Sequence, residues 1–262
     1  MLKRNLAPIT EEMWEEIDDR AKEVLSNYLS ARKVVNVTGP KGWGYTVVPE
    51  GRIEPVKDDK TDTDFGLYKV KPLVESRVEF ELDRWEMDNI VRGAKDVELE
   101  NLEEAVRKIA LFEENAIYNG LEKGMIEGLK SSSEQNTMNF GKNGDEILAA
   151  VSEGILRLQD AFAGKPYALI VGKEAYKRIN ANCTGYPLLA RLEELLGMEV
   201  IYSHVVDGAF LIPCDHDDLE MTIGKDLSIG YQNSDNNKVK FFITESFTFR
   251  VLDPDIIIKY NI

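Results

Sequence analysis

The clearest pattern of apolar and polar positions lies near the amino terminus. Apolar side chains recur at spacings of three and four from Met13 to Leu29, and charged residues fill most of the positions between them. Pro8 and Thr10 form a start signal, and the acidic residues after Thr10 suit the positive end of a helix dipole. The pattern predicts an amphipathic helix of about five turns. Periodicity alone favours packing on the protein's own core over a surface that receives a partner.

A second long helix is predicted from Asn101 to about residue 120. Asn101 with Glu104 three positions later matches a capping box, and apolar residues from Leu102 to Ile117 form one stripe. The helix carries acidic side chains that invite comparison with a di-iron carboxylate site: Glu103, Glu104, Glu113 and Glu114. Such a site needs a Glu-x-x-His pair on each of two helices, which the chain lacks. We therefore expect these glutamates to form a solvated helix face.

Two extended stretches lie between these helices, at residues 45–56 and 67–82. Both contain β-branched and aromatic residues with scattered prolines, and a polar, mostly acidic segment at 57–64 joins them. A two-stranded hairpin on its own is marginally stable in water. The pattern therefore predicts a long arm whose stabilising surface lies on another subunit.

The rest of the chain mixes helix and strand patterns, which indicates an α+β fold. Helices are expected at residues 145–158, 174–179 and 188–196, with strands at 167–171, 198–202 and 209–212. The last part is mostly β, with strands expected at 227–231, 239–244 and 247–252.

Composition narrows the function classes. Asp and Glu total 47 against 32 Lys and Arg, so the formal net charge is −15. This excess of acid argues against a nucleic-acid partner, since such proteins need a cationic footprint. No apolar run approaches the roughly 20 residues that a membrane helix requires, and the first residues do not resemble a signal peptide. Together with two cysteines that form no disulfide framework, this predicts a cytoplasmic protein without a membrane partner.

Candidate catalytic chemistry is sparse. The Gly-Lys pairs are not followed by Ser or Thr, as a phosphate-binding loop requires, and the chain has only two histidines. The densest group of possible metal ligands is the run 214–218, Cys-Asp-His-Asp-Asp, but adjacent residues in one loop rarely converge on one ion. We therefore predict no catalytic residues and no metal site, which favours an assembling, structural protein over an enzyme.

Eight segments carry a resemblance to a known family, in the same order along nearly the whole chain. They lie at residues 6–10 with Trp14 and 17–21, then at 31–37, 39–43, 82–89, 102–108, 185–188, 226–231 and 242–249. In these segments the chain resembles the encapsulins, the shell proteins of bacterial and archaeal nanocompartments. The resemblance implies the fold of tailed-phage major capsid proteins, with a peripheral domain, an extended loop and an axial domain. Its expected boundaries are an amino-terminal cargo-facing part at 1–44, the extended loop at 45–82, peripheral parts at 83–129 and 223–262, and the axial domain at 130–222.

The resemblance also implies partners and sites. Family members form closed icosahedral shells of sixty or more copies. Their cargo is an enzyme, usually a ferritin-like iron-storage protein or a dye-decolourising peroxidase, which docks through a terminal targeting peptide. The family pattern places this docking site at Leu25, Leu29, Arg32, Asn36 and Ile229. Asn36 departs from relatives that have an acidic residue there.

Two further sites follow from the same resemblance. A five-fold pore that admits small solutes is expected at Cys183, Thr184, Gly185 and Tyr186. No cofactor is required, but some members stack a flavin in the segment that contains Trp85. Two alternatives stay open: a prophage major capsid protein that packages DNA, and a peptidase- or bacteriocin-like enzyme.

Overall fold

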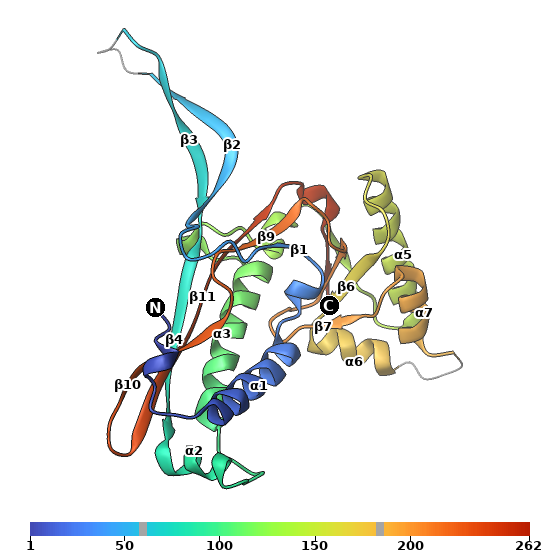
Figure 1. Ribbon diagram of the computed structural model, residues 1–262. Coiled ribbons are helices and arrows are strands. Elements are labelled where there is room, and N and C mark those ends of the chain that lie inside the picture. The colour runs from blue at the N-terminus through green and yellow to red at the C-terminus, as the bar shows by residue number, and fades with distance from the viewer. Residues whose placement is uncertain (58–61, 182–185) are drawn as a thin grey trace.

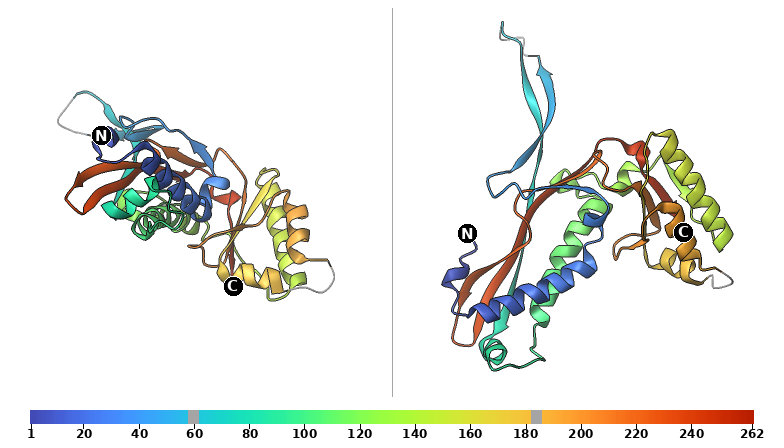
Figure 2. Two further views of the ribbon diagram at one scale, coloured as in Figure 1. Left: turned by 60° about the horizontal axis from the view of Figure 1, so that its bottom comes forward. Right: turned by 45° about the vertical axis from the view of Figure 1, so that its right-hand side comes forward.

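Two mixed layers of helix and sheet form the body of the protein, and a two-stranded arm projects from the first layer (Figure 1). The computed structural model describes residues 1–57, 62–181 and 186–262. One cluster of buried apolar side chains lies where two long helices, Glu11–Tyr28 and Glu100–Tyr118, cover the first sheet. The other fills the second layer and extends into the first sheet, where it includes Met221, Phe247 and Phe249. Figure 2 shows the two layers side by side with the arm extending away from both.

The first sheet is organised around one long strand. β11 (Lys238–Val251) pairs along its first part with β10 (Ser228–Ser234) on one side and β4 (Val74–Asp83) on the other. Its second part pairs with β9 (Leu219–Ile223), which in turn pairs with β1 (Asn36–Thr38). The prediction of two strands at 239–244 and 247–252 was therefore wrong, because Glu245 and Ser246 continue the pairing with β4.

Two long helices pack together against this sheet. α1 (Glu11–Tyr28) confirms the amphipathic helix predicted from Met13, with the Thr10 hydroxyl accepting a hydrogen bond from the Met13 amide at 3.3 Å. α3 (Glu100–Tyr118) confirms the second helix. The apolar faces of both helices meet in one buried cluster with the start of β11.

The predicted cap of α3 was wrong. Leu99 occupies the capping position without a side-chain hydrogen bond, and Asn101 lies inside the helix. The Asn101 amide instead donates to the Glu81 carbonyl of β4 at 3.0 Å, so a contact with the sheet takes the place of the expected local one. A short helix that the sequence did not predict, α2 (Arg84–Val91), precedes α3 and is capped by Asp83.

The second layer has a five-stranded sheet in the order β5-β12-β8-β6-β7. Its strands are β5 (Thr137–Asn139), β6 (Tyr167–Val171), β7 (Ile201–Tyr202), β8 (Ala209–Pro213) and β12 (Ile258–Asn261). Its longer helices are α5 (Gly144–Asp160), α6 (Lys173–Ala181) and α7 (Leu188–Leu196), as the sequence predicted. Shorter helical turns are η1 (Arg4–Leu6), η2 (Ala31–Lys33), η3 (Glu122–Gly124), α4 (Leu129–Ser132) and η4 (Pro254–Ile256).

Two strands fall within the residue range expected for one domain but pair with strands of the other layer. β9 begins before residue 222 but joins the first sheet, and β12 follows residue 223 but pairs with β8 in the second. The chain thus crosses between the layers through its last residues. Sheet pairing of this kind is set by partners distant in sequence, so periodicity does not reveal it.

The arm consists of β2 (Val47–Val56) and β3 (Phe65–Pro72), paired antiparallel. The second extended stretch, predicted as continuous over 67–82, is divided at Leu73: β3 belongs to the arm, and β4 belongs to the first sheet. Most arm residues are exposed, including the large apolar side chains of Ile53, Leu67 and Tyr68, of which Tyr68 is 77% exposed. Among the described residues of β2 and β3, none belongs to either buried apolar cluster, which agrees with the prediction of an arm with little to pack against.

Candidate functional site

A groove lies between α1 and strand β10, with a volume of about 260 Å³. Leu25 reaches it from the helix and Ile229 from the strand, so the fold brings together two of the predicted docking residues that are far apart in sequence. Ile229 is buried, whereas Leu25 is half-buried. None of the other residues that line the groove was among the predicted docking residues: Leu2, Arg4, Asp18, Ala21, Lys22, Leu227, Ser228 and Ile243.

The groove has an apolar floor and a charged rim. Ala21, Leu25 and Ile243 are apolar, whereas Arg4 of η1 and Asp18 and Lys22 of α1 carry charges. The Lys22 ammonium lies 2.9 Å from an Asp19 carboxylate oxygen, and this bond raises the pKa of Lys22 above its ordinary value. The sequence contained one usable signal for these residues, the helical spacing of Asp18, Ala21, Lys22 and Leu25. Nothing in it placed Leu2 or Leu227 opposite them.

The other predicted docking residues do not line this groove in the described part of the chain. Leu29 follows the end of α1, and Asn36 begins β1, where its amide lies 3.4 Å from a carboxylate oxygen of Asp217. Arg32 lies in η2 with its side chain 19% exposed. The structure therefore divides the predicted set into a groove pair and three residues outside it.

Arg32 is held by three carboxylates. Its guanidinium bonds to Glu113 of α3 at 2.8 Å, to Asp226 at 2.8 Å and to Glu245 of β11 at 3.2 Å. Glu113 and Glu245 are fully buried. Burial, followed by the nearby Glu113 charge, raises the pKa of Glu245 well above its ordinary value. Arg32 thus joins three elements as the cation of a buried network, and its contact with cargo stays a prediction.

The expectation of a solvated glutamate face on α3 was wrong for Glu113 and Glu114, which are both fully buried. The Glu114 carboxylate accepts hydrogen bonds from the Ala31 amide at 2.8 Å, the Ser203 hydroxyl at 3.4 Å and the Ser30 hydroxyl. Burial raises the pKa of Glu114 to about 7 despite these donors. The hydrogen-bond partners of Glu113 and Glu114 lie on segments that only folding brings together. The local sequence pattern therefore could not predict that these two glutamates are buried.

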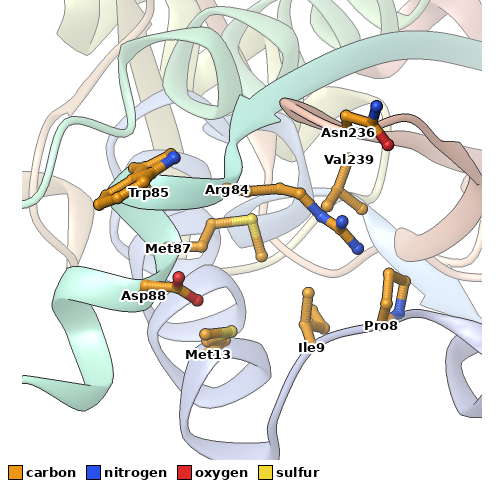
Figure 3. A pocket seen from close by; sticks show the side chains of 9 residues that line it. All are labelled: Pro8, Ile9, Met13, Arg84, Trp85, Met87, Asp88, Asn236 and Val239. Carbon is orange, nitrogen blue, oxygen red and sulfur yellow. The ribbon is translucent and has the colours of Figure 1, made fainter.

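A second cavity, of about 390 Å³, lies beside α2 (Figure 3). Trp85 and Asp88 line it from α2, Met13 from α1 and Val239 from β11. The Trp85 ring is 73% exposed, and the Arg92 guanidinium carbon lies 5.9 Å from its centre. In Figure 3 the Arg84 side chain crosses the cavity while Trp85 stands at its edge. An exposed indole at the rim of a cavity is compatible with stacking a planar ring.

Three of the four predicted pore residues, Cys183, Thr184 and Gly185, lie outside the described residues. Tyr186 is described and is 59% exposed, and its hydroxyl donates to Glu194 of α7 at 3.5 Å.

The acidic loop at 214–218 shows no convergence on an ion. Burial raises the pKa of the Cys214 thiol, whose sulfur faces the Lys33 carbonyl oxygen at 3.8 Å. Within residues 1–57, 62–181 and 186–262, no three His, Cys, Asp or Glu side chains are grouped as metal ligands would be. Over the same ranges no helix is long and apolar enough to cross a membrane.

Comparisons with known proteins identify the family. A family described as "Encapsulating protein for peroxidase" matches residues 1–248. The Type 1 encapsulin shell protein of Rhodospirillum rubrum is 35% identical over 262 aligned residues, which cover 97% of this chain and 94% of that protein.

Solved structures share the fold at low sequence identity. The virus-like particle protein of Pyrococcus furiosus superposes with a TM-score of 0.67 at 14% identity, over 94% of this chain and 98% of that one. The capsid protein of Myoviridae phage XM1 superposes with a TM-score of 0.54 at 12% identity, over 88% and 92% of the two chains. These matches confirm the α+β, tailed-phage-capsid-like fold, and by sequence the chain belongs to the encapsulin family.

Proposed function

We propose that this protein is the structural subunit of a closed icosahedral shell in the cytoplasm and carries no catalysis of its own. The exposed arm is the observation that supports assembly most directly. Its strands β2 and β3 present large apolar side chains to solvent, and a soluble monomer gains nothing by exposing them. A neighbouring subunit that covers the arm would bury this surface, as the arrangement of a symmetric shell permits.

Assembly is tested by negative-stain electron microscopy of the purified protein. We expect uniform closed particles. A monodisperse monomer at micromolar concentration would contradict the proposal, and particles filled with DNA would favour the prophage-capsid alternative.

We further infer that the groove between α1 and β10 receives the targeting peptide of a cargo enzyme. The convergence of Leu25 and Ile229 on one groove carries this inference. The groove is apolar at its floor, which suits an extended peptide with small and aliphatic side chains. Each aliphatic side chain that is buried there contributes roughly 1.5–3 kcal/mol, less the cost of ordering a flexible tail.

The cargo itself is proposed to be a dye-decolourising peroxidase or a ferritin-like iron-storage protein. The description of the matching family, which names a peroxidase, supports the first class. The acidic composition supports the second, because a negatively charged shell concentrates Fe²⁺ near its openings. Openings near Tyr186 would admit small solutes, and a flavin stacked on Trp85 is the proposed optional cofactor.

Docking is tested by coexpressing the shell protein with a fluorescent protein that carries a tail of alternating Leu and Gly or Ser residues. We expect Leu25→Ser to lower the number of fluorescent proteins per shell by about tenfold, because it removes one aliphatic contact. Val24→Ser is the matched control, since Val24 is a half-buried neighbour on the same helix that does not line the groove. Equal loading of the two variants, with intact shells, would contradict docking in this groove.

A further inference from the structure

The first residues of the chain lie along one side of the groove between α1 and β10. Leu2 lines the groove, and its carbonyl oxygen accepts a hydrogen bond from the Tyr231 amide of β10 at 2.8 Å. The 3-10 turn η1 follows directly and returns the chain toward α1. In Figures 1 and 2 the amino-terminal segment lies beside β10 in each view. The protein therefore places a piece of its own backbone where an extended peptide could bind.

Strand β10 is suited to pair with an extended peptide at this edge. It is the terminal strand on its side of the first sheet, with β11 as its partner on the other edge. Alternate residues of a strand direct their backbone groups to the same edge, so Ile229 faces the same way as Tyr231. Adding a strand to such an edge is a common way for a protein to bind a peptide.

Gly230 permits the close approach of the amino-terminal segment. A Cβ atom at this position would lie 2.9 Å from the Leu2 carbonyl oxygen and 2.4 Å from a ring carbon of Phe242. A side chain here would push the segment away from β10. The short distance shows that Leu2 is seated directly on the strand.

Arg4 fastens this segment to α1. Its guanidinium forms two hydrogen bonds to the Asp18 carboxylate, at 2.7 and 3.2 Å, and lies 3.9 Å from the centre of the Trp14 ring. The Arg4 and Asp18 side chains are each 34% exposed, so water weakens their attraction. The contact orders the segment with only a small net free energy, so a competing peptide can displace it.

We propose that residues 1–6 form a strap that occupies one end of the groove. An incoming docking peptide displaces Leu2, and a backbone carbonyl of the peptide accepts the hydrogen bond from the Tyr231 amide in its place. The proposal rests on the function inferred above for the groove. It adds regulation, because the apparent affinity of a peptide that competes with the strap is its intrinsic affinity multiplied by the fraction of subunits whose strap is open. A strap that is mostly closed therefore weakens binding. The partner is an extended peptide segment whose backbone pairs with β10.

The strap is tested first by hydrogen exchange on assembled shells, read in fragments that span residues 228–234. Arg4→Gln removes the ion pair and the contact with Trp14, so we expect exchange in this segment to quicken by about tenfold. Arg4→Lys keeps the charge without the two-bond geometry and should give a smaller increase. The matched control is Lys3→Gln, which makes the same change of charge one residue earlier, at an exposed side chain.

The second measurement is loading of the fluorescent protein with the Leu-containing tail, at limiting expression of that protein. If the strap competes with the tail, Arg4→Gln raises the number loaded per shell several-fold, up to the factor seen in exchange, while Lys3→Gln matches the unchanged protein. A tail with Asp in place of each Leu reports nonspecific capture.

Two outcomes overturn the proposal in distinguishable ways. If Arg4→Gln quickens exchange but leaves loading unchanged or lower, residues 1–6 belong to the binding site or lie apart from it, and the groove keeps its proposed function. If the Leu-containing tail loads no better than the Asp-containing tail in any variant, the proposed function of the groove fails, and the strap proposal fails with it whatever the exchange shows.

Discussion

At the scale of single residues, two adjacent buried carboxylates of α3 connect this helix to segments that are distant in sequence. Glu113 and Glu114 follow one another on a helix with a clear apolar stripe, and local pattern assigns both to solvent. Their burial depends on Ser30, Arg32 and Ser203, which approach only in the folded chain. Removing a polar group from water is tolerated when hydrogen bonds compensate, and each carboxylate has such donors. The network joins η2 to α3 and to the segment after β7.

The raised pKa of Glu114 predicts how stability depends on pH. Its carboxyl titrates near pH 7 in the folded protein and near its ordinary value of 4.5 when unfolded, so between these limits the folded state holds more protons. The free energy of unfolding should therefore fall as pH rises from about 5 to 7, and level off above. Glu114→Gln removes this contribution. We expect it to match the unchanged protein near pH 5 and to exceed its stability at pH 8 by up to about 3 kcal/mol, at about 1.4 kcal/mol for each pKa unit.

Denaturant unfolding at fixed protein concentration, from pH 5 to 8, measures this difference. Glu245 is present in both proteins, so its own raised pKa cancels from the comparison. Glu104→Gln is the control, because Glu104 is exposed on the same helix and its pKa is lowered by Lys108. Parallel stability curves for the Glu114→Gln variant and the unchanged protein would show that Glu114 does not titrate in this range.

At the scale of elements, helices were predictable and sheet membership was not. The periodic stripes of α1, α3 and α5 gave these helices to within a few residues, because each buries one face against a core. The division of the second extended stretch into β3 and β4, and the single length of β11, depend on pairing between strands far apart in sequence. For the same reason, Leu25 and Ile229 could be predicted as groove residues only through the resemblance to a family. Leu2 and Arg4 were identified as groove residues only in the structure.

The arm gives a prediction at this scale. Leu67→Ala combined with Tyr68→Ala removes exposed apolar surface from β3 without touching either buried cluster. We expect the variant to fold with an unchanged circular dichroism spectrum but to lose closed particles, with assembly weakened by at least about tenfold, because two aliphatic or aromatic contacts are lost at each arm. Size-exclusion chromatography with light scattering measures the distribution of species.

Lys69→Ala is the matched control for the arm, since Lys69 lies between Tyr68 and Val70 on the same strand and is also exposed. Loss of particles in both variants would show that assembly depends on the strand as a whole rather than on its apolar side chains. Full assembly of the double variant would contradict the proposed role of the arm's apolar surface.

At the scale of the whole molecule, the net charge of −15 becomes a property of an assembly. Subunits of the same sign repel one another as they meet, and salt shortens the range of this repulsion from about 30 Å at 0.01 M to about 10 Å at 0.1 M. The same change of salt weakens the apolar contacts of the arm very little.

We therefore expect the assembled fraction to rise as NaCl increases from 0.01 to 0.15 M, measured by light scattering at fixed protein concentration and pH. KCl at equal ionic strength should act alike, and sucrose at equal osmolality should have little effect. If salt instead dissolves the particles, attraction between opposite charges across the subunit contacts outweighs the net repulsion, and acidic and basic side chains must then face one another at those contacts.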